Sequence, residues 1–167
     1  MSDKIKNYWN NTASTNSDWS YYQPDSTDRL QNINEIIEIP ERAFPAAIYP
    51  LVKKYMGNLF GKKVCIPSSG DNLAAFGFHL LGAKVTSCDI SENQINNAKS
   101  IADKYNWDIE FICQDSMNLE KIKDNKYDLV YTSNGVHVWI NDLIGMYKNF
   151  NRILKEEDTT FFLKPIQ

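Results

Sequence analysis

The stretch 63–91, KVCIPSSGDNLAAFGFHLLGAKVTSCDIS, constrains the fold of this chain more than any other segment. It opens with a short apolar run typical of a buried parallel strand, followed by a turn rich in Ser and Gly. Apolar spacing then predicts a helix, capped by Ser69 or Asp71, and a second strand follows Gly82. Asp89 stands at the carboxyl end of that strand. A unit of this order and length predicts one nucleotide-binding half of a doubly wound sheet.

The remaining chain continues this alternation of strands and helices. Ser91 and Gln94 have the spacing of a capping box, which predicts a helix over 92–105. Before the opening unit, an apolar stripe predicts a core-facing helix over 46–56. We expect strands at 108–113, 127–132 and 160–163, a short helix or loop at 117–122 and a helix from 143 to 154. The pattern predicts an α/β fold with a mostly parallel, Rossmann-like sheet of about five strands and helices on both faces.

The N-terminal segment differs from the rest in composition. Residues 1–38 are rich in Asn, Ser, Tyr and Trp, without a sustained apolar period. Such aromatic side chains need a surface on which to lie, so we expect an arm packed on the main domain. The aromatic residues either close over a ligand or simply anchor the arm. The predicted division is an N-terminal arm or lid at 1–45 and a nucleotide-binding domain at 46–167.

Composition excludes several classes of function. The net charge is −3 and no basic run is present, which argues against a nucleic-acid partner. No apolar stretch approaches the roughly 20 residues that span a membrane. The first residues lack the apolar centre of a signal peptide, so we expect a cytoplasmic protein. The three cysteines lack metal-ligand spacing and are expected to be buried apolar side chains, with no metal site.

Polar clusters directly follow each of the first four predicted strands. They occupy residues 68–72, 89–91, 114–116 and 133–137. Because the carboxyl ends of parallel strands meet at one edge of a sheet, we expect the four clusters to converge on one ligand site.

The order and contents of these clusters resemble those of the class I S-adenosylmethionine-dependent methyltransferases. The resemblance extends over about 61–163, and its second-strand region is similar to that of small-molecule methyltransferases. Besides 63–91 it rests on CQDSMNL at 113–119, YDLVYTSNGVHVW at 127–139 and LIGMYKNFNRILK at 143–155. It implies methyl transfer from S-adenosylmethionine to an unidentified small molecule, with S-adenosylhomocysteine as product.

The same resemblance implies roles for individual residues. Asp89 would accept hydrogen bonds from both ribose hydroxyls, Ile90 would lie against the adenine, and Asp115 would bind the adenine amino group. Gly70 would let the backbone approach the cofactor closely. The further implied site residues are Ser68, Asp71 and Asn72 in the first loop, Ser116 beside the adenine, Asn134 near the amino-acid end of the cofactor, and His137 as the one nearby candidate base. Trp139 either lines a substrate pocket or packs the loop under the following helix, and we favour the packing role.

The first loop departs from the family pattern. The three glycine positions of the family hold Ser68, Gly70 and Asn72, and Ile66 replaces an acidic residue that indirectly anchors the cofactor's ammonium group. Asp71 is the candidate substitute for that acid. Ser is small and Asn tolerates a left-handed backbone, so the turn remains sterically allowed.

Two other functions remain as alternatives. The sequence stops just after the fifth predicted strand, without the family's final antiparallel pair, so we expect either a fragment or a shortened paralogue. Such a chain would be a non-catalytic cofactor-binding or dimerisation module, and its exposed edge strand would favour a homodimer. A nicotinamide-dependent oxidoreductase would need G-x-G-x-x-G in the first loop, and SSGDNL at 68–73 does not fit that pattern.

Overall fold

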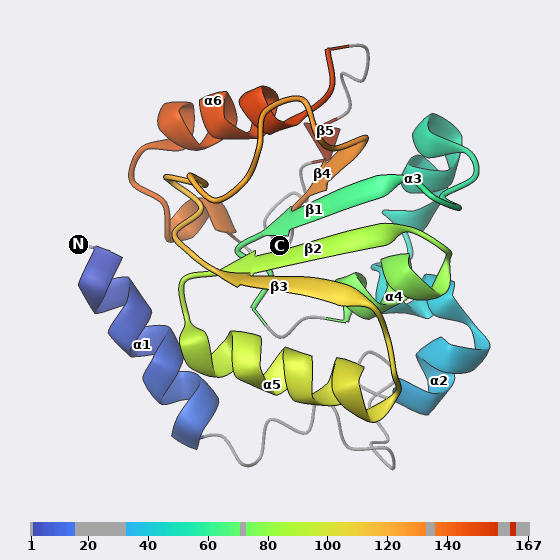
Figure 1. Ribbon diagram of the computed structural model, residues 1–167, viewed down its shortest axis with the longest axis horizontal. Coiled ribbons are helices and arrows are strands. Elements are labelled where there is room, and N and C mark those ends of the chain that lie inside the picture. Colours follow the sequence, from blue (N-terminus) through green and yellow to red (C-terminus); the bar gives the residue numbers. More distant parts are fainter. Residues whose placement is uncertain (1, 16–32, 71–72, 133–135, 157–160, 163–167) are drawn as a thin grey trace.

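The computed structural model describes residues 2–15, 33–70, 73–132, 136–156 and 161–162, and within this part the sheet has five strands, all parallel (Figure 1). Their order across the sheet is β3-β2-β1-β4-β5. The order reverses between β1 and β4, so the two central strands define the switch point. The predicted doubly wound sheet is confirmed. The strands are β1 Lys63–Pro67, β2 Lys84–Asp89, β3 Ile109–Cys113, β4 Leu129–Tyr131 and β5 Phe161–Phe162.

Helices cover both faces of this sheet, as predicted. The described helices are α1 Ser2–Thr15, α2 Ile33–Glu38, the 3-10 helix η2 Pro40–Ala43, α3 Tyr49–Met56, α4 Ala74–Leu80, α5 Glu92–Lys104, the 3-10 helix η3 Val136–Val138 and α6 Leu143–Ile153. Val64 and Ile66 of β1 face an apolar cluster that includes α2, α3, α4 and α5. Cys65, between them, faces a second cluster built mainly from α6 and the loop at 117–122. Successive side chains of a strand point to opposite faces, so β1 belongs to both cores.

Three local predictions are corrected by the structure. The helix expected over 46–56 begins at Tyr49, and its stripe is only partly buried: Leu51 is 40% and Tyr55 59% exposed. Ser69 does not directly precede α4; that residue is Leu73, which makes no side-chain capping bond, and Asp71 lies outside the described residues. The hydroxyl of Ser69 bonds Ser87 Oγ on β2 at 2.5 Å.

Strand β4 begins two residues later than predicted because the preceding residues bond outside the ladder. The N–H of Tyr127 donates to the carbonyl of Ile153 at 3.0 Å. Asp128 Oδ2 accepts from the N–H of Lys63 at 2.7 Å, and its other oxygen pairs with Lys155. These contacts tie β4 to the start of β1 and the end of α6.

Two helices in the N-terminal segment were missed by sequence reasoning. Helix α1 has a 14-residue span in a region without a clear apolar period, and it runs alongside α5 (Figure 1). Short helices gain most of their stability from tertiary packing, so a weak amphipathic pattern does not reveal them. The division of the chain at residue 45 stays a prediction.

Candidate functional site

Asp89 ends β2 and organises the turn around it. Its Oδ2 accepts from the N–H of Gly70 at 2.8 Å, and its Oδ1 accepts from the N–H of Ser91 at 2.8 Å. The residue is 6% exposed. A carboxylate offers about four lone-pair positions, so each oxygen can still accept a further hydrogen bond.

The pKa of Asp89 is raised because its environment favours the protonated form of the carboxyl group. Burial raises the pKa of Asp89, and the N–H groups of Ser91, Gly70 and Ile90 lower it. The negative charge of Asp115 also raises the pKa, and the result lies above the usual value for an aspartate. Further hydrogen-bond donors, such as ligand hydroxyls, would stabilise the charged form.

The loop after β1 has a left-handed backbone at two positions. Ser68 has φ +50° and Gly70 has φ +56°. A Cβ added at Gly70 would lie 2.5 Å from Gln94 Oε1, so the loop packs directly on the first turn of α5. Ser68 thus adopts a glycine-like conformation at one of the positions where the family has glycine, at a cost of roughly 1–2 kcal/mol.

Serine hydroxyls connect the loop after β1 with the loop after β3 and with strand β2. Ser68 Oγ and Ser116 Oγ are 2.6 Å apart, which joins the loops after β1 and β3. Ser69 Oγ bonds Ser87 Oγ on β2. The structure therefore brings Ser68, Gly70, Asp89 and Ser116 into one bonded region at the carboxyl edge of the sheet. Ser87 and Gln94 were not among the predicted site residues.

The other predicted adenine-side residues also have local partners. Asp115 is half-buried, and its Oδ1 accepts from the N–H of Met117 at 2.9 Å, which stabilises the turn after β3. Ile90 is half-buried and its carbonyl accepts from Cys113 Sγ at 3.6 Å. Their roles toward an adenine stay predictions. Asp71, Asn72 and Asn134 lie outside the described residues.

The carboxyl end of β4 carries a buried hydroxyl. Thr132 directly follows β4 and is 6% exposed. Within the part of the chain that the structure describes, its Oγ1 has no hydrogen-bond partner. An unsatisfied buried hydroxyl costs about 1–3 kcal/mol, so a ligand group that bonds it would recover free energy.

His137 lies on η3, after β4, and has a partner that the sequence did not suggest. Its Nε2 lies 2.7 Å from Tyr147 Oη on α6. Burial raises the pKa of Tyr147, so the phenol keeps its proton at neutral pH. Tyr147 follows the apolar spacing of α6 and therefore resembled an ordinary core residue.

Trp139 packs against the N-terminal helix. Its ring stacks on Tyr8 with centroids 5.2 Å apart and meets the edge of Trp9 at 5.1 Å. The sequence predicted packing under the following helix, whereas these ring contacts are with α1, which is far away in the sequence. Trp139 follows η3, so α1 contacts the segment beyond β4.

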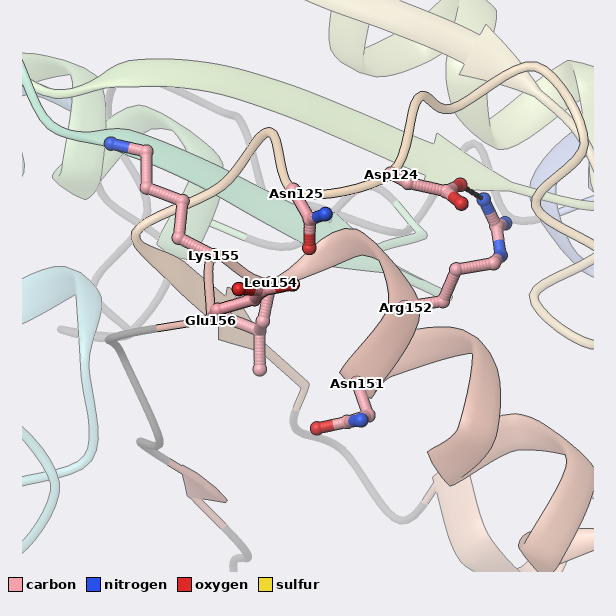
Figure 2. Close-up of a pocket in the computed structure, with 7 residues that line it drawn as sticks. All are labelled: Asp124, Asn125, Asn151, Arg152, Leu154, Lys155 and Glu156. Atoms are coloured by element: carbon pink, nitrogen blue, oxygen red, sulfur yellow. Dashed lines mark hydrogen bonds and ion pairs between the residues drawn. The ribbon is translucent and has the colours of Figure 1, made fainter.

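A polar pocket of about 360 Å³ lies away from this region, beside the end of α6 and the loop before β4 (Figure 2). The two basic side chains that line the pocket form ion pairs: Arg152 pairs with Asp124, as Figure 2 shows, and Lys155 pairs with Asp128. None of the predicted site residues lines this pocket. Among the described residues we find no cluster of three metal-ligating side chains, and no described helix has the length and apolar character needed to cross a bilayer.

Solved structures similar to this chain include three informative cases. Magnesium protoporphyrin IX methyltransferase (ChlM) from Synechocystis PCC 6803, with bound SAH, has a TM-score of 0.66 and 21% identity to this chain. The match covers 92% of this chain and 68% of the ChlM chain. PH0226 from Pyrococcus horikoshii OT3 has a TM-score of 0.59 and 26% identity over 82% of this chain. A protein from Methanococcus maripaludis has a TM-score of 0.56 and 22% identity over 73%.

The chain spans 58% of PH0226 and 57% of the Methanococcus protein, so it corresponds to little more than half of these relatives. None of the curated proteins compared with the sequence matches it. A family model described as "Methyltransferase domain" matches residues 68–157, which is more than half of the 167 residues. The strand order, the position of Asp89 and this match agree with the resemblance drawn from the sequence. The chain belongs to the class I methyltransferase domain family.

Proposed function

We propose that this chain binds S-adenosylmethionine at the carboxyl edge of its sheet and methylates a small molecule. The observation that carries the proposal is the environment of Asp89: a buried carboxylate at the end of β2, oriented by two backbone N–H groups and with lone pairs remaining. Two vicinal ribose hydroxyls are the kind of donor pair that such a carboxylate accepts. ChlM, which shares the fold, has been seen with bound SAM and with bound SAH.

The surrounding residues fit this cofactor. Gly70 has a left-handed backbone and no side chain, so the loop packs closely on Gln94 while its N–H donates to Asp89. Thr132 offers a buried hydroxyl at the end of β4 that has no partner among the described residues. We assign the adenine to Ile90, Asp115 and Ser116, and the amino-acid end of the cofactor to the segment that contains Asn134. Asp71 and Asn72 complete the proposed first loop.

Bound S-adenosylmethionine supplies a methyl group that its sulfonium already activates. The protein therefore has to orient the two reactants and exclude water, and it needs no strong acid or nucleophile. The hydrogen-bonded loops after β1, β2 and β3 provide a preorganised surface for this task.

His137 is the proposed base for an acceptor that must lose a proton. In the tautomer with its proton on Nε2, the imidazole donates to Tyr147 Oη, and Nδ1 carries the lone pair. Tyr147 then fixes the ring orientation before and after proton transfer. This role is independent of cofactor binding.

Replacing His137 with asparagine is expected to lower the turnover number about 100-fold on an acceptor that reacts as its conjugate base, while SAH affinity stays unchanged. Steady-state kinetics on the acceptor and calorimetry with SAH measure the two effects. Unchanged turnover would remove His137 from the mechanism. Replacement of the exposed Lys148, one residue after Tyr147 on α6, is the control for nonspecific effects of a substitution near this pair.

Calorimetric titration with S-adenosylhomocysteine and, separately, with NAD tests the proposed cofactor. We expect binding of the first at micromolar concentrations, about −8 kcal/mol, and no binding of NAD, because the first loop lacks the pyrophosphate-binding glycine pattern. Binding of NAD alone would refute the methyltransferase proposal. Tight binding of S-adenosylhomocysteine without turnover on any acceptor in a small-molecule panel would instead favour a non-catalytic module. This second candidate is kept because Ser68, with its left-handed backbone, stands in the first loop where the family has glycine.

A further inference from the structure

Helix α1 is hydrogen-bonded to the turn that follows the proposed ribose carboxylate. Asn10 Oδ1 accepts from Ser91 Oγ at 2.7 Å and from the N–H of Asn93 at 3.3 Å, and the Asn10 carbonyl accepts from Asn93 Nδ2 at 2.9 Å. One turn earlier, Lys6 pairs with Glu92 at 2.9 Å. These contacts join residues more than 80 positions apart in the sequence.

The contact of Asn10 continues into the candidate cofactor site. Ser91 Oγ, which donates to Asn10, also accepts from the N–H of Gln94 and so caps α5. The backbone N–H of Ser91 donates to Asp89, whose other oxygen holds the N–H of Gly70. Ser91 is fully buried, so water cannot readily replace a lost partner. Asn10 is therefore bonded to the residue that orients the Asp89 carboxylate.

The same helix contacts the other side of the switch point. Tyr8 and Trp9 pack on Trp139, which follows β4 and η3. Helix α1 thus bonds to the segment after β2 through Asn10 and packs on the segment after β4 through its aromatic residues. A helix fixed at both places restricts the relative position of the two segments between which the fold places its ligand.

We infer that Asn10 is a positioning residue for cofactor binding, an inference that rests on the proposed function. By accepting from Ser91 Oγ and from the N–H of Asn93, it holds the Asp89–Ser91 turn in the conformation that receives the ribose. Asn10 acts indirectly, because it bonds to Ser91 and Asn93 and not to the ligand. Loss of its side-chain oxygen leaves two donors at a buried turn without their acceptor, and the turn reorients to satisfy them.

Calorimetry with S-adenosylhomocysteine on three variants tests this inference. Asn10→Ala is expected to raise the Kd about tenfold relative to the wild-type chain. Asn10→Asp keeps the accepting oxygen and is expected to bind nearly as the wild-type chain does. Asn7→Ala is the matched control, because Asn7 is exposed on the same helix and the substitution changes helix propensity equally; its Kd is expected to stay at the wild-type value.

A double-mutant cycle separates positioning from general destabilisation. If Asn10 acts through the Ser91 hydroxyl, Asn10→Ala adds little to the Kd of a Ser91→Ala protein, whereas independent effects multiply. A Kd for Asn10→Ala equal to that of Asn7→Ala overturns the inference, and so does a multiplicative cycle. If Asn10→Ala fails to fold by circular dichroism, Ser91→Ala removes the hydroxyl that donates to Asn10 Oδ1 from the α5 side, and unchanged binding by that variant overturns the inference. Absence of binding by the wild-type chain would refute both this inference and the proposed function, whereas wild-type binding with an unaffected Asn10→Ala variant refutes only the inference.

Discussion

Replacing Asp89 with alanine is expected to weaken binding of S-adenosylhomocysteine by at least a factor of about 100. The carboxylate is proposed to accept two ribose hydroxyls, and a hydrogen bond to a charged group is worth about 1.5–3 kcal/mol, so the loss is about 3 kcal/mol or more. The same change leaves the N–H groups of Gly70 and Ser91 without their acceptor, which disorganises the loop that faces the ligand. Isothermal titration calorimetry measures the loss directly.

The pH dependence of binding provides an independent check on Asp89. Burial raises its pKa in the free protein, and ligand hydroxyls favour the charged form, so the bound protein has the lower pKa. Affinity is therefore full above the raised pKa of the free protein and falls as the pH drops through it. This part of the pH dependence is expected to disappear in Asp89→Ala. The control is Asp103→Ala, an exposed aspartate in the last turn of α5, which should keep both affinity and pH profile; equal effects of the two substitutions would contradict the assignment.

Replacing Phe78 with alanine is expected to produce a large loss of stability. Phe78 is fully buried, and its ring makes T-shaped contacts with two aromatic rings. Its ring centroid lies 4.7 Å from that of Phe44 and 5.2 Å from that of Tyr131. Phe78 therefore connects α4, the segment after η2 and β4. Phe to Ala substitutions in cores cost about 3–5 kcal/mol, which corresponds to a fall in Tm of roughly 10 °C for a domain of this size.

Thermal or chemical denaturation followed by circular dichroism measures the Phe78 effect. Phe60→Ala is the matched control, because Phe60 is 81% exposed and the substitution should change the free energy of unfolding by no more than about 0.5 kcal/mol. A loss below about 1 kcal/mol for Phe78→Ala would show that this aromatic cluster does not hold α4 on the sheet.

The central part of the fold was predictable because its signals are local. The apolar run before Ser68, the helix cap at Ser91 and the acid at the end of β2 each depend on neighbours within a few residues. Ser91 accepts from the N–H of Gln94, as the capping-box spacing predicted. Parallel strands then require crossovers, which fixed the helices on both faces.

The errors occurred where distant contacts decide the local structure. Ser69 looked like a helix cap, but Leu73 precedes α4, and the hydroxyl of Ser69 bonds that of Ser87 on the neighbouring strand. Tyr55 fits the apolar stripe of its helix, yet the residue is 59% exposed. Such outcomes depend on what the rest of the molecule places opposite each residue.

The sequence by itself determined the doubly wound class and singled out Asp89, because strand and helix periods and the position of an acid after a strand are properties of short segments. Tertiary structure decided what surrounds that acid. Three kinds of contact around the site join residues 10 to more than 80 positions apart: the two serine pairs of the loop after β1, the partner of His137 and the docking of α1 through Asn10. Hydrogen bonds at that separation are set by the packing of whole elements, and the residue types alone do not specify them.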